Sequence, residues 1–259
     1  MAGRYAAKPV EAVRNRELEA TSRENWSDSL EAVYETDPEI IAAVLPPPLG
    51  PGPEPLVRLN ISTVTMPGGH VFGAGWFGVQ ARHGDTLGEY PLLMPMSTEQ
   101  ATVGGRETIG EPKKIAKITS ERDGDTIHNT VSRMGYTVAE IKGTIVGERD
   151  PEQNERIDFY FKLLPSPEGP GMLDGDPYLV ESHKHTRERK AEIVDGEVIL
   201  GESPLDPVAD LPVRTLRSIT LCQRATVVEA HTVGTVPAAD VIPYVHQRYD
   251  DLSVLGKRD

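Results

Sequence analysis

The segment Leu56-Val57-Arg58-Leu59-Asn60-Ile61 alternates apolar and polar residues, and β-branched residues continue from it to Thr65. Successive side chains on a β-strand point to opposite faces, so this pattern predicts a strand with one apolar face. The rest of the chain carries similar patterns, which predict strands near 71–82, 89–96, 113–121, 126–134, 136–147, 155–164, 177–190, 197–201 and 213–234.

Turn signals separate several of these predicted strands. Asp123-Gly124, Met134-Gly135 and Asp195-Gly196 are typical of tight hairpin turns, the last of them between Ile193-Val194 and Val198-Ile199. Many strands at hairpin spacing predict a large antiparallel sheet, and closure into a barrel would remove its exposed edges. We therefore predict a β-rich (α+β) fold, built on an antiparallel β-barrel with a few flanking helices.

Two helices are predicted beside the strands. Asp37 is a good N-cap and Pro38 suits the first helical position, while Pro46-Pro47-Pro48 ends the helix. A final helix is predicted from about 237 to 249, with an irregular first turn because Pro243 falls inside it.

Composition restricts the kinds of partner. The net charge of −13 over 259 residues argues against nucleic acid and anionic membrane surfaces. No apolar run approaches the roughly 20 residues of a membrane span, and no secretory signal is evident. The single cysteine, Cys222, fits a reducing compartment. We therefore expect a cytoplasmic protein, with residues 1–28 as a polar extension, irregular or a short surface helix, and 29–259 as a single domain.

Two adjacent lysines end the stretch Gly105-Arg106-Glu107-Thr108-Ile109-Gly110-Glu111-Pro112-Lys113-Lys114. A lysine ammonium is a poor nucleophile near neutral pH, because its ordinary pKa is about 10.4. Burial in an apolar pocket, or a second cation nearby, frees the amine to attack a carbonyl. Sequence chemistry alone leaves two interpretations open, a nucleophile or two solvated lysines at the start of a strand.

This block, GRE followed by four residues and PKK, resembles the active-site signature of the acetoacetate decarboxylase family. Pro55-Leu56-Val57-Arg58, Gly88-Glu89-Tyr90 and Asp210-Leu211-Pro212-Val213 resemble other segments of that family, so the resemblance covers roughly 30–250. It implies an antiparallel β-barrel or cone, a small oxo-acid substrate, no cofactor and no metal. It also implies a homo-oligomer.

The resemblance assigns roles to individual residues. Lys113 matches the lysine that forms a Schiff base with the substrate ketone, and Lys114 matches its neighbour. Because side chains alternate on a strand, the two are expected on opposite faces. Burial of Lys113 would therefore lower its pKa more than the charge of Lys114 would. Arg106 and Glu107 are either a structural ion pair or substrate contacts. Met94 either lines an apolar pocket for substrate or fills the core.

The chain also departs from the family pattern. Asn60 stands in the strand where the family carries a glutamate, and the stretch 68–83, where a second is expected, contains no acidic residue. Glu111 replaces an aromatic residue two positions before Lys113 and would share its face. It could supply the missing acid-base group, or it could be a solvent-facing loop residue. Arg23 resembles the family arginine that receives the substrate carboxylate; the alternative is an ordinary surface arginine.

Three further motifs are interpreted as structural. Gly73-Ala74-Gly75-Trp76-Phe77-Gly78 satisfies G-x-G-x-x-G but is not followed by an apolar helix, so its glycines are expected to let a strand bend or backbone approach closely. His183-Lys184-His185 places two imidazoles on one strand face without a clear third metal ligand, which favours a solvated polar strand. Cys222 is expected to be a buried inert thiol.

These observations predict a carbon–carbon lyase that uses a Lys113 Schiff base to decarboxylate a β-oxo acid to a ketone and CO2. Two alternatives stay open. The same iminium and enamine chemistry supports an aldolase or dehydratase acting on a 2-oxo acid. A non-catalytic protein that binds a small carboxylate is the third possibility.

Overall fold

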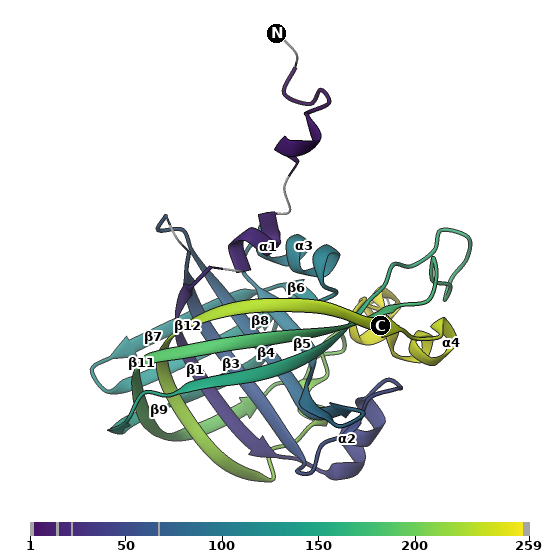
Figure 1. The fold of residues 1–259 in the computed structure, drawn as a ribbon. Helices are drawn as coiled ribbons and strands as arrows, with labels where there is room; N and C mark the ends of the chain where they lie inside the picture. The colour runs from purple at the N-terminus through teal and green to yellow at the C-terminus, as the bar shows by residue number, and fades with distance from the viewer. Residues whose placement is uncertain (1–2, 14–15, 22, 67, 256–259) are drawn as a thin grey trace.

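The structure is a computed structural model that describes residues 3–13, 16–21, 23–66 and 68–255. One twelve-stranded sheet dominates these residues (Figure 1). Its strands are β1 (Asn25–Glu35), β2 (Gly50–Pro51), β3 (Leu56–Thr65), β4 (Val71–His83), β5 (Thr86–Met96), β6 (Lys113–Ile115), β7 (Lys117–Asp123), β8 (Thr126–Arg133), β9 (Tyr136–Arg149), β10 (Gln153–Lys162), β11 (Tyr178–Leu200) and β12 (Thr215–Thr235).

The sheet closes on itself. Its order runs β10-β5-β4-β3-β1-β12-β11, and β10 pairs with β11 as well as with β5, which completes a ring. Most pairings are antiparallel; the β10–β5 and β5–β6 pairings are parallel. The predicted β-rich, barrel-like fold class is therefore confirmed.

The remaining strands, β9, β8 and β7, continue the sheet from β11 and fold back over β3. Strand β3 shows how this arrangement sorts side chains. Its apolar residues Val57, Leu59 and Ile61 enter the main hydrophobic core, together with residues of β8 and β9. Its polar residues Arg58 and Asn60 are also buried, because they point into the ring instead of into solvent.

The helices lie outside the sheet. They are α1 (Arg16–Thr21), α2 (Pro38–Val44), α3 (Glu99–Thr108) and α4 (Ala238–Val241), with short 3-10 helices η1 (Val10–Ala12), η2 (Val208–Asp210), η3 (Ile242–Gln247) and η4 (Leu252–Leu255). Helix α1 lies beside α3 (Figure 1). Helix α2 confirms the prediction from Asp37 and Pro38, whereas the final helix is broken into α4 and η3 just before Pro243. No described helix is long and apolar enough to cross a membrane.

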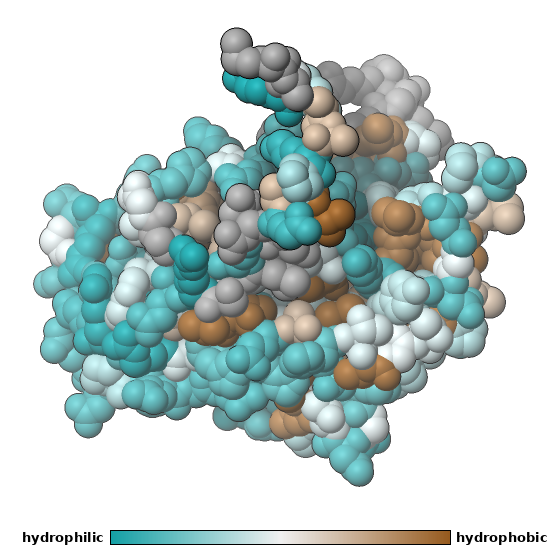
Figure 2. Space-filling view, turned by 45° about the horizontal axis from the view of Figure 1, so that its top comes forward, coloured by the Kyte–Doolittle hydropathy of each residue, from teal (hydrophilic) through white to brown (hydrophobic). Residues whose placement is uncertain are grey.

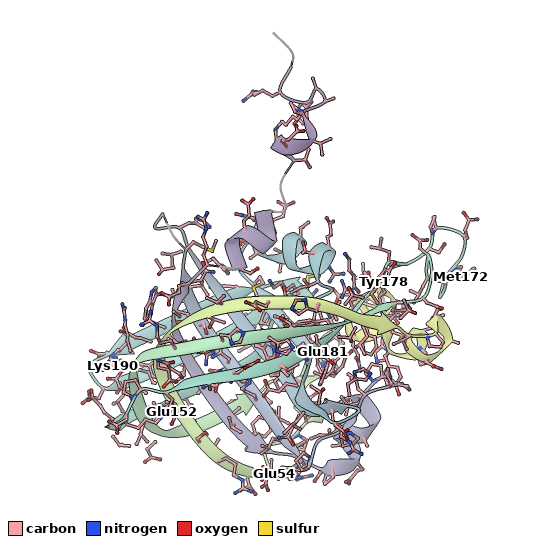
Figure 3. The ribbon with its side chains drawn as sticks, in the orientation of Figure 1. Glu54, Glu152, Met172, Tyr178, Glu181 and Lys190 are labelled. Atoms are coloured by element: carbon pink, nitrogen blue, oxygen red, sulfur yellow. The ribbon has the colours of Figure 1, made fainter. Side chains whose placement is uncertain are left out.

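The hairpin predicted at Asp195-Gly196 is wrong. Strand β11 runs through these residues without a turn and extends across the molecule, with Tyr178 near one end and Lys190 well along it (Figure 3). Gly196 pairs instead with Gly143 of β9, where a Cβ atom on Gly196 would lie 2.2 Å from the Lys142 carbonyl oxygen. This glycine therefore permits a close approach of two strands.

Two other predictions need correction, and one helix was not predicted. The expected strand 113–121 is divided into β6 and β7. Strand β1 begins at Asn25, inside the segment 1–28 that we predicted to be irregular or a short surface helix. Helix α3 covers the segment that ends in Gly105-Arg106-Glu107, for which no helix was predicted. The division into an extension and a single domain stays a prediction.

Candidate active site

Lys113 is buried at the start of β6, which pairs in parallel with β5 so that Lys113 lies opposite Met94. The Glu111 carboxylate approaches the same amine, with 2.6 Å between Glu111 Oε2 and Lys113 Nζ. Glu111 is buried as well, which corrects the alternative of a solvent-facing loop residue. The pair therefore joins an amine and a carboxylate away from bulk water.

Helix α3 shapes this pair. Its N-cap residue Thr98 accepts a hydrogen bond from the Ala101 backbone N–H at 3.4 Å. At its other end, the Gly105 carbonyl accepts backbone N–H bonds from Ile109, Gly110 and Glu111, which turns the chain back toward β6. A Cβ atom on Gly105 would lie 1.9 Å from Glu111 Oε2 and 2.5 Å from Lys113 Nζ. The glycine of the GRE motif thus leaves room for the pair.

The Lys113–Glu111 pair lines a cavity of about 220 Å³ inside the ring of strands. One part of its wall is apolar, since Trp76, Met94 and Met96 belong to a second buried cluster with Tyr160. Met94 therefore both packs in a cluster and lines the cavity. The face of the molecule in Figure 2 is mostly hydrophilic, with separate hydrophobic areas.

Asn60 faces the same cavity and is buried. Its Oδ1 accepts a hydrogen bond from Ser62, which is itself bonded to Ser29 at 2.8 Å. Its Nδ2 has no hydrogen-bond partner among the described residues. A buried donor of this kind costs free energy unless it finds an acceptor, so Asn60 offers a hydrogen bond to a bound molecule.

A cluster of three arginines, Arg58, Arg156 and Arg224, forms another part of the cavity wall. All three reach one carboxylate, Glu31, at 3.5, 3.2 and 2.9 Å respectively. Burial alone would raise the pKa of Glu31, but the three guanidinium groups hold it well below its ordinary value. Arg58 also bonds Glu89 and lies 3.6 Å from the centre of the Trp76 ring.

Asp158 is fully buried behind the cavity wall. Its Oδ2 accepts hydrogen bonds from Trp76 Nε1 at 3.0 Å and from the Tyr160 hydroxyl at 2.8 Å, and it pairs with Lys184. Burial alone would raise the pKa of Asp158, but Lys184 and Arg58 lower it. Burial and Asp158 together raise the pKa of Tyr160, which keeps its phenol protonated.

The structure separates the two adjacent lysines. Lys114 points away from Lys113 and forms ion pairs of 2.9 Å with both Asp206 and Asp250. Arg133 bonds the same two carboxylates. This buried network joins β6 to the segments before η2 and after η3, so Lys114 has partners of its own on the opposite face of β6.

The remaining predicted site residues lie away from the cavity. Arg106 donates hydrogen bonds to the backbone carbonyls of Lys113 at 2.8 Å and Arg248 at 3.3 Å, so it secures β6 from outside. Glu107 is exposed, and no ion pair links it to Arg106 among the described side chains. Arg23 is exposed and is absent from the cavity wall.

Sequence reasoning missed the charged residues of the cavity wall, Arg58, Arg156, Lys184 and Arg224, and it also missed Glu31, the carboxylate that the three arginines share. One signal was available: Arg58 alternates with Val57 and Leu59, and a charged residue on one face of a strand can point into a barrel as readily as into solvent. Lys184 was hidden in a segment interpreted as a solvated strand. Its neighbours His183 and His185 do point outward and contact Glu155.

The motifs interpreted as structural can now be placed. The glycine-rich segment 73–78 lies within β4, where a Cβ atom on Gly78 would come 2.4 Å from the Tyr90 carbonyl oxygen. Burial and the neighbouring Glu188 raise the pKa of the Cys222 thiol to about 12. Among the described residues, no group of three or more His, Cys, Asp or Glu side chains could hold a metal ion.

Fold and site together define a class: a closed β-sheet protein with a buried amine and carboxylate at the wall of an internal cavity, an arrangement suited to carbonyl chemistry. Comparison with known proteins gives the family. The sequence model of the family "Acetoacetate decarboxylase (ADC)" matches residues 8–235, and the chain belongs to this family.

Named relatives agree. The acetoacetate decarboxylase of Chromobacterium violaceum is 31% identical over 201 residues, covering 70% of this chain and 74% of that protein. The acetoacetate decarboxylase of Streptomyces nogalater is 30% identical over 200 residues, covering 71% of this chain and 77% of that protein.

Solved structures show the same fold at low sequence identity. The acetoacetate decarboxylase of Legionella pneumophila has a TM-score of 0.71 at 20% identity, covering 83% of this chain and 88% of that one. An acetoacetate decarboxylase-like enzyme from Sphingomonas wittichii has a TM-score of 0.73 at 17% identity, covering 82% of this chain and 93% of that one. The enduracididine biosynthesis enzyme MppR has a TM-score of 0.70 at 15% identity, covering 82% of this chain and 88% of that one. It was solved in complex with the condensation product of pyruvate and imidazole 4-carboxaldehyde.

Proposed function

We propose that this enzyme decarboxylates a β-oxo acid through a Schiff base on Lys113. The neutral amine attacks the ketone, and loss of water gives an iminium ion. The bond to the carboxylate then breaks, its electron pair moves into the iminium to form an enamine, and CO2 leaves. Protonation of the enamine carbon and hydrolysis release the ketone. The observation that carries this proposal is the buried Lys113–Glu111 pair at the cavity wall.

Glu111 is proposed as the acid-base group. At 2.6 Å from Lys113 Nζ, its carboxylate can take a proton from the ammonium and return it to the carbinolamine hydroxyl, so that water leaves. It can then deliver a proton toward the enamine. Glu111 thus replaces the carboxylates that the sequence lacks at Asn60 and over 68–83.

Asn60 is proposed to place the substrate. Its buried Nδ2 donor faces the cavity and can bond an oxygen of the oxo acid while the apolar wall of Met94 and Trp76 surrounds the reacting carbons. An apolar surrounding favours decarboxylation, because the carboxylate loses its charge as CO2 forms.

The test is release of CO2 from a panel of β-oxo acids, beginning with acetoacetate. Lys113→Arg keeps the positive charge but removes the usable amine, so CO2 release should fall to the uncatalysed rate. Lys117→Arg is the matched control, because Lys117 is exposed on β7. Turnover by Lys113→Arg comparable to that of Lys117→Arg would refute the proposal.

A second function is a Schiff-base aldolase or dehydratase acting on a 2-oxo acid. Two observations favour this second function. The chain lacks the family's glutamates at Asn60 and over 68–83, and the structural neighbour MppR was solved with a condensation product of pyruvate. Pyruvate with an aldehyde would then give a condensation product without CO2. A protein that neither releases CO2 nor condenses pyruvate, yet binds small carboxylates, would fit the non-catalytic alternative.

We further propose that the enzyme works in the cytoplasm as a homo-oligomer. Family membership and the buried, unpaired Cys222 support this setting. Light scattering of the purified chain should give a mass that is a multiple of 28.3 kDa; a mass of one chain would contradict the proposed assembly.

A further inference from the structure

The arginine cluster, Arg58, Arg156 and Arg224, has no part in the reaction at Lys113. Its charges are also unbalanced. Three guanidinium groups face two carboxylates, Glu31 and Glu89, which leaves one positive charge in excess. The other charged groups of the cavity have a partner of opposite charge, Glu111 for Lys113 and Asp158 for Lys184. Among the described residues, the cavity therefore has an excess positive charge at one place.

Arg156 is the member best placed to meet a ligand. Both of its contacts with Glu31, each 3.2 Å long, are made by Nη1. A guanidinium carries five N–H donors in a planar fork, so its other edge can bind a carboxylate through two parallel bonds. Burial and the neighbouring Arg58 and Arg224 lower the pKa of Arg156. The nearby carboxylates therefore do not fully balance its positive charge.

The cluster and Lys113 belong to different parts of one cavity. Lys113 on β6 lies opposite Met94 of β5, while Arg58 on β3 lies 3.6 Å from the centre of the Trp76 ring on β4. Arg156 is on β10, which pairs with the same β5. Both groups line the cavity together with Trp76 and Met94, so a molecule that reaches both must present them at two ends with an apolar middle.

The carboxylate bound by the arginines is not the one that leaves. Guanidinium groups stabilise a carboxylate as an anion, whereas a departing carboxylate must give up its charge to the iminium. Binding the departing group so strongly would stabilise the ground state and slow the reaction. The arginine cluster therefore suits a second carboxylate, one that is kept through the reaction.

We propose that the substrate is an oxo dicarboxylic acid, whose far carboxylate is held by Arg156 and its two neighbours. This inference rests on the proposed function. The carboxylate beside the Schiff base leaves as CO2, the electron pair of the broken bond passes through the enamine to a new C–H bond, and water releases the amine. The far carboxylate is unchanged, so the product is an oxo monocarboxylic acid.

The test compares two acids that differ at one end only. Both 3-oxoadipate and 3-oxohexanoate are β-oxo acids of six carbons, but the second has a methyl group in place of the far carboxylate. The value of kcat/KM should be about 10–100-fold higher for 3-oxoadipate, as expected of charge-assisted hydrogen bonds to a buried group. Arg156→Gln should abolish most of this preference, Arg156→Lys should keep part of it, and Arg122→Gln, in an ion pair on β7, should keep all of it.

Binding of unreactive acids separates the two proposals. Adipate should bind about 10–100-fold more tightly than hexanoate by calorimetry, and Arg156→Gln should remove the difference. Equal turnover of both oxo acids with equal binding of adipate and hexanoate would overturn the dicarboxylate proposal and leave the Schiff-base function standing. Tighter binding of adipate without turnover of either oxo acid would support the dicarboxylate site and refute the decarboxylase function.

Discussion

Replacing Gly105 by alanine tests how closely helix α3 fits over the amine and carboxylate. The new Cβ atom would lie 1.9 Å from Glu111 Oε2, where ordinary contact begins at 3.4 Å, so the carboxylate must move by about 3.4 − 1.9 = 1.5 Å. The same atom would lie 2.5 Å from Lys113 Nζ, which must move by about 0.9 Å. A misplacement of about 1 Å can cost roughly 10²-fold in rate.

We therefore expect Gly105→Ala to lower kcat for CO2 release by about 10²-fold. Overpacking a buried site costs about 1–3 kcal/mol, which for a protein of this size lowers Tm by about 2–12 °C. Steady-state kinetics and differential scanning calorimetry measure the two effects. Gly147→Ala is the control, because a Cβ atom there meets nothing within 4 Å. A folded Gly105→Ala enzyme with kcat within about twofold of the wild type would refute the packing argument.

Three further predictions address the acid-base group, the arginine cluster and the sheet. Glu111→Gln keeps the shape of the side chain and removes its titration, so turnover should fall by about 10²–10⁴-fold; unchanged turnover would exclude this role. Glu31→Gln removes the carboxylate that Arg58, Arg156 and Arg224 share, and in the described part of the chain only Arg58 keeps another, Glu89, so the free energy of unfolding should fall by about 3–5 kcal/mol at pH 7, measured in urea. Because the folded-state pKa of Glu31 is depressed below its ordinary 4.5, this difference should be complete above pH 4.5 and shrink as the pH falls below it; a difference that grows in acid would contradict the assignment. Gly196→Ala should lower the free energy of unfolding by about 1–3 kcal/mol, because the new Cβ atom collides with the Lys142 carbonyl oxygen, and should leave kcat unchanged. An unaffected unfolding midpoint would show that β9 and β11 can separate there.

Much of the fold was predictable because local patterns and tertiary structure agree. Strand β3 follows its alternation of apolar and polar residues over 56–65, and the turn at Asp123-Gly124 joins β7 to β8 as predicted. The turn predicted at Asp195-Gly196 was wrong, because a glycine that permits a hairpin also permits close contact between strands. Only the pairing of Gly196 with Gly143, 53 positions away in the sequence, distinguishes the two uses (196 − 143 = 53).

The candidate site was predictable in part. Lys113 and Glu111 were expected to share a face because alternate residues do so on a strand, and the structure brings them together although β6 begins only at Lys113. Arg58, Arg156 and Arg224 come from three strands, and local sequence cannot show that they converge on Glu31. Arg23 was the arginine that the family pattern suggested for the substrate carboxylate, but it is exposed and is absent from the cavity wall.

Reductive trapping of the Schiff base is the most direct test of the mechanism. The wild-type enzyme is treated with borohydride in the presence of an oxo acid that it turns over, digested, and analysed by mass spectrometry. We predict one stable adduct, with the mass of the reduced imine, on the peptide that contains Lys113. An adduct on another lysine, or no adduct while CO2 is still released, would contradict a Lys113 Schiff base.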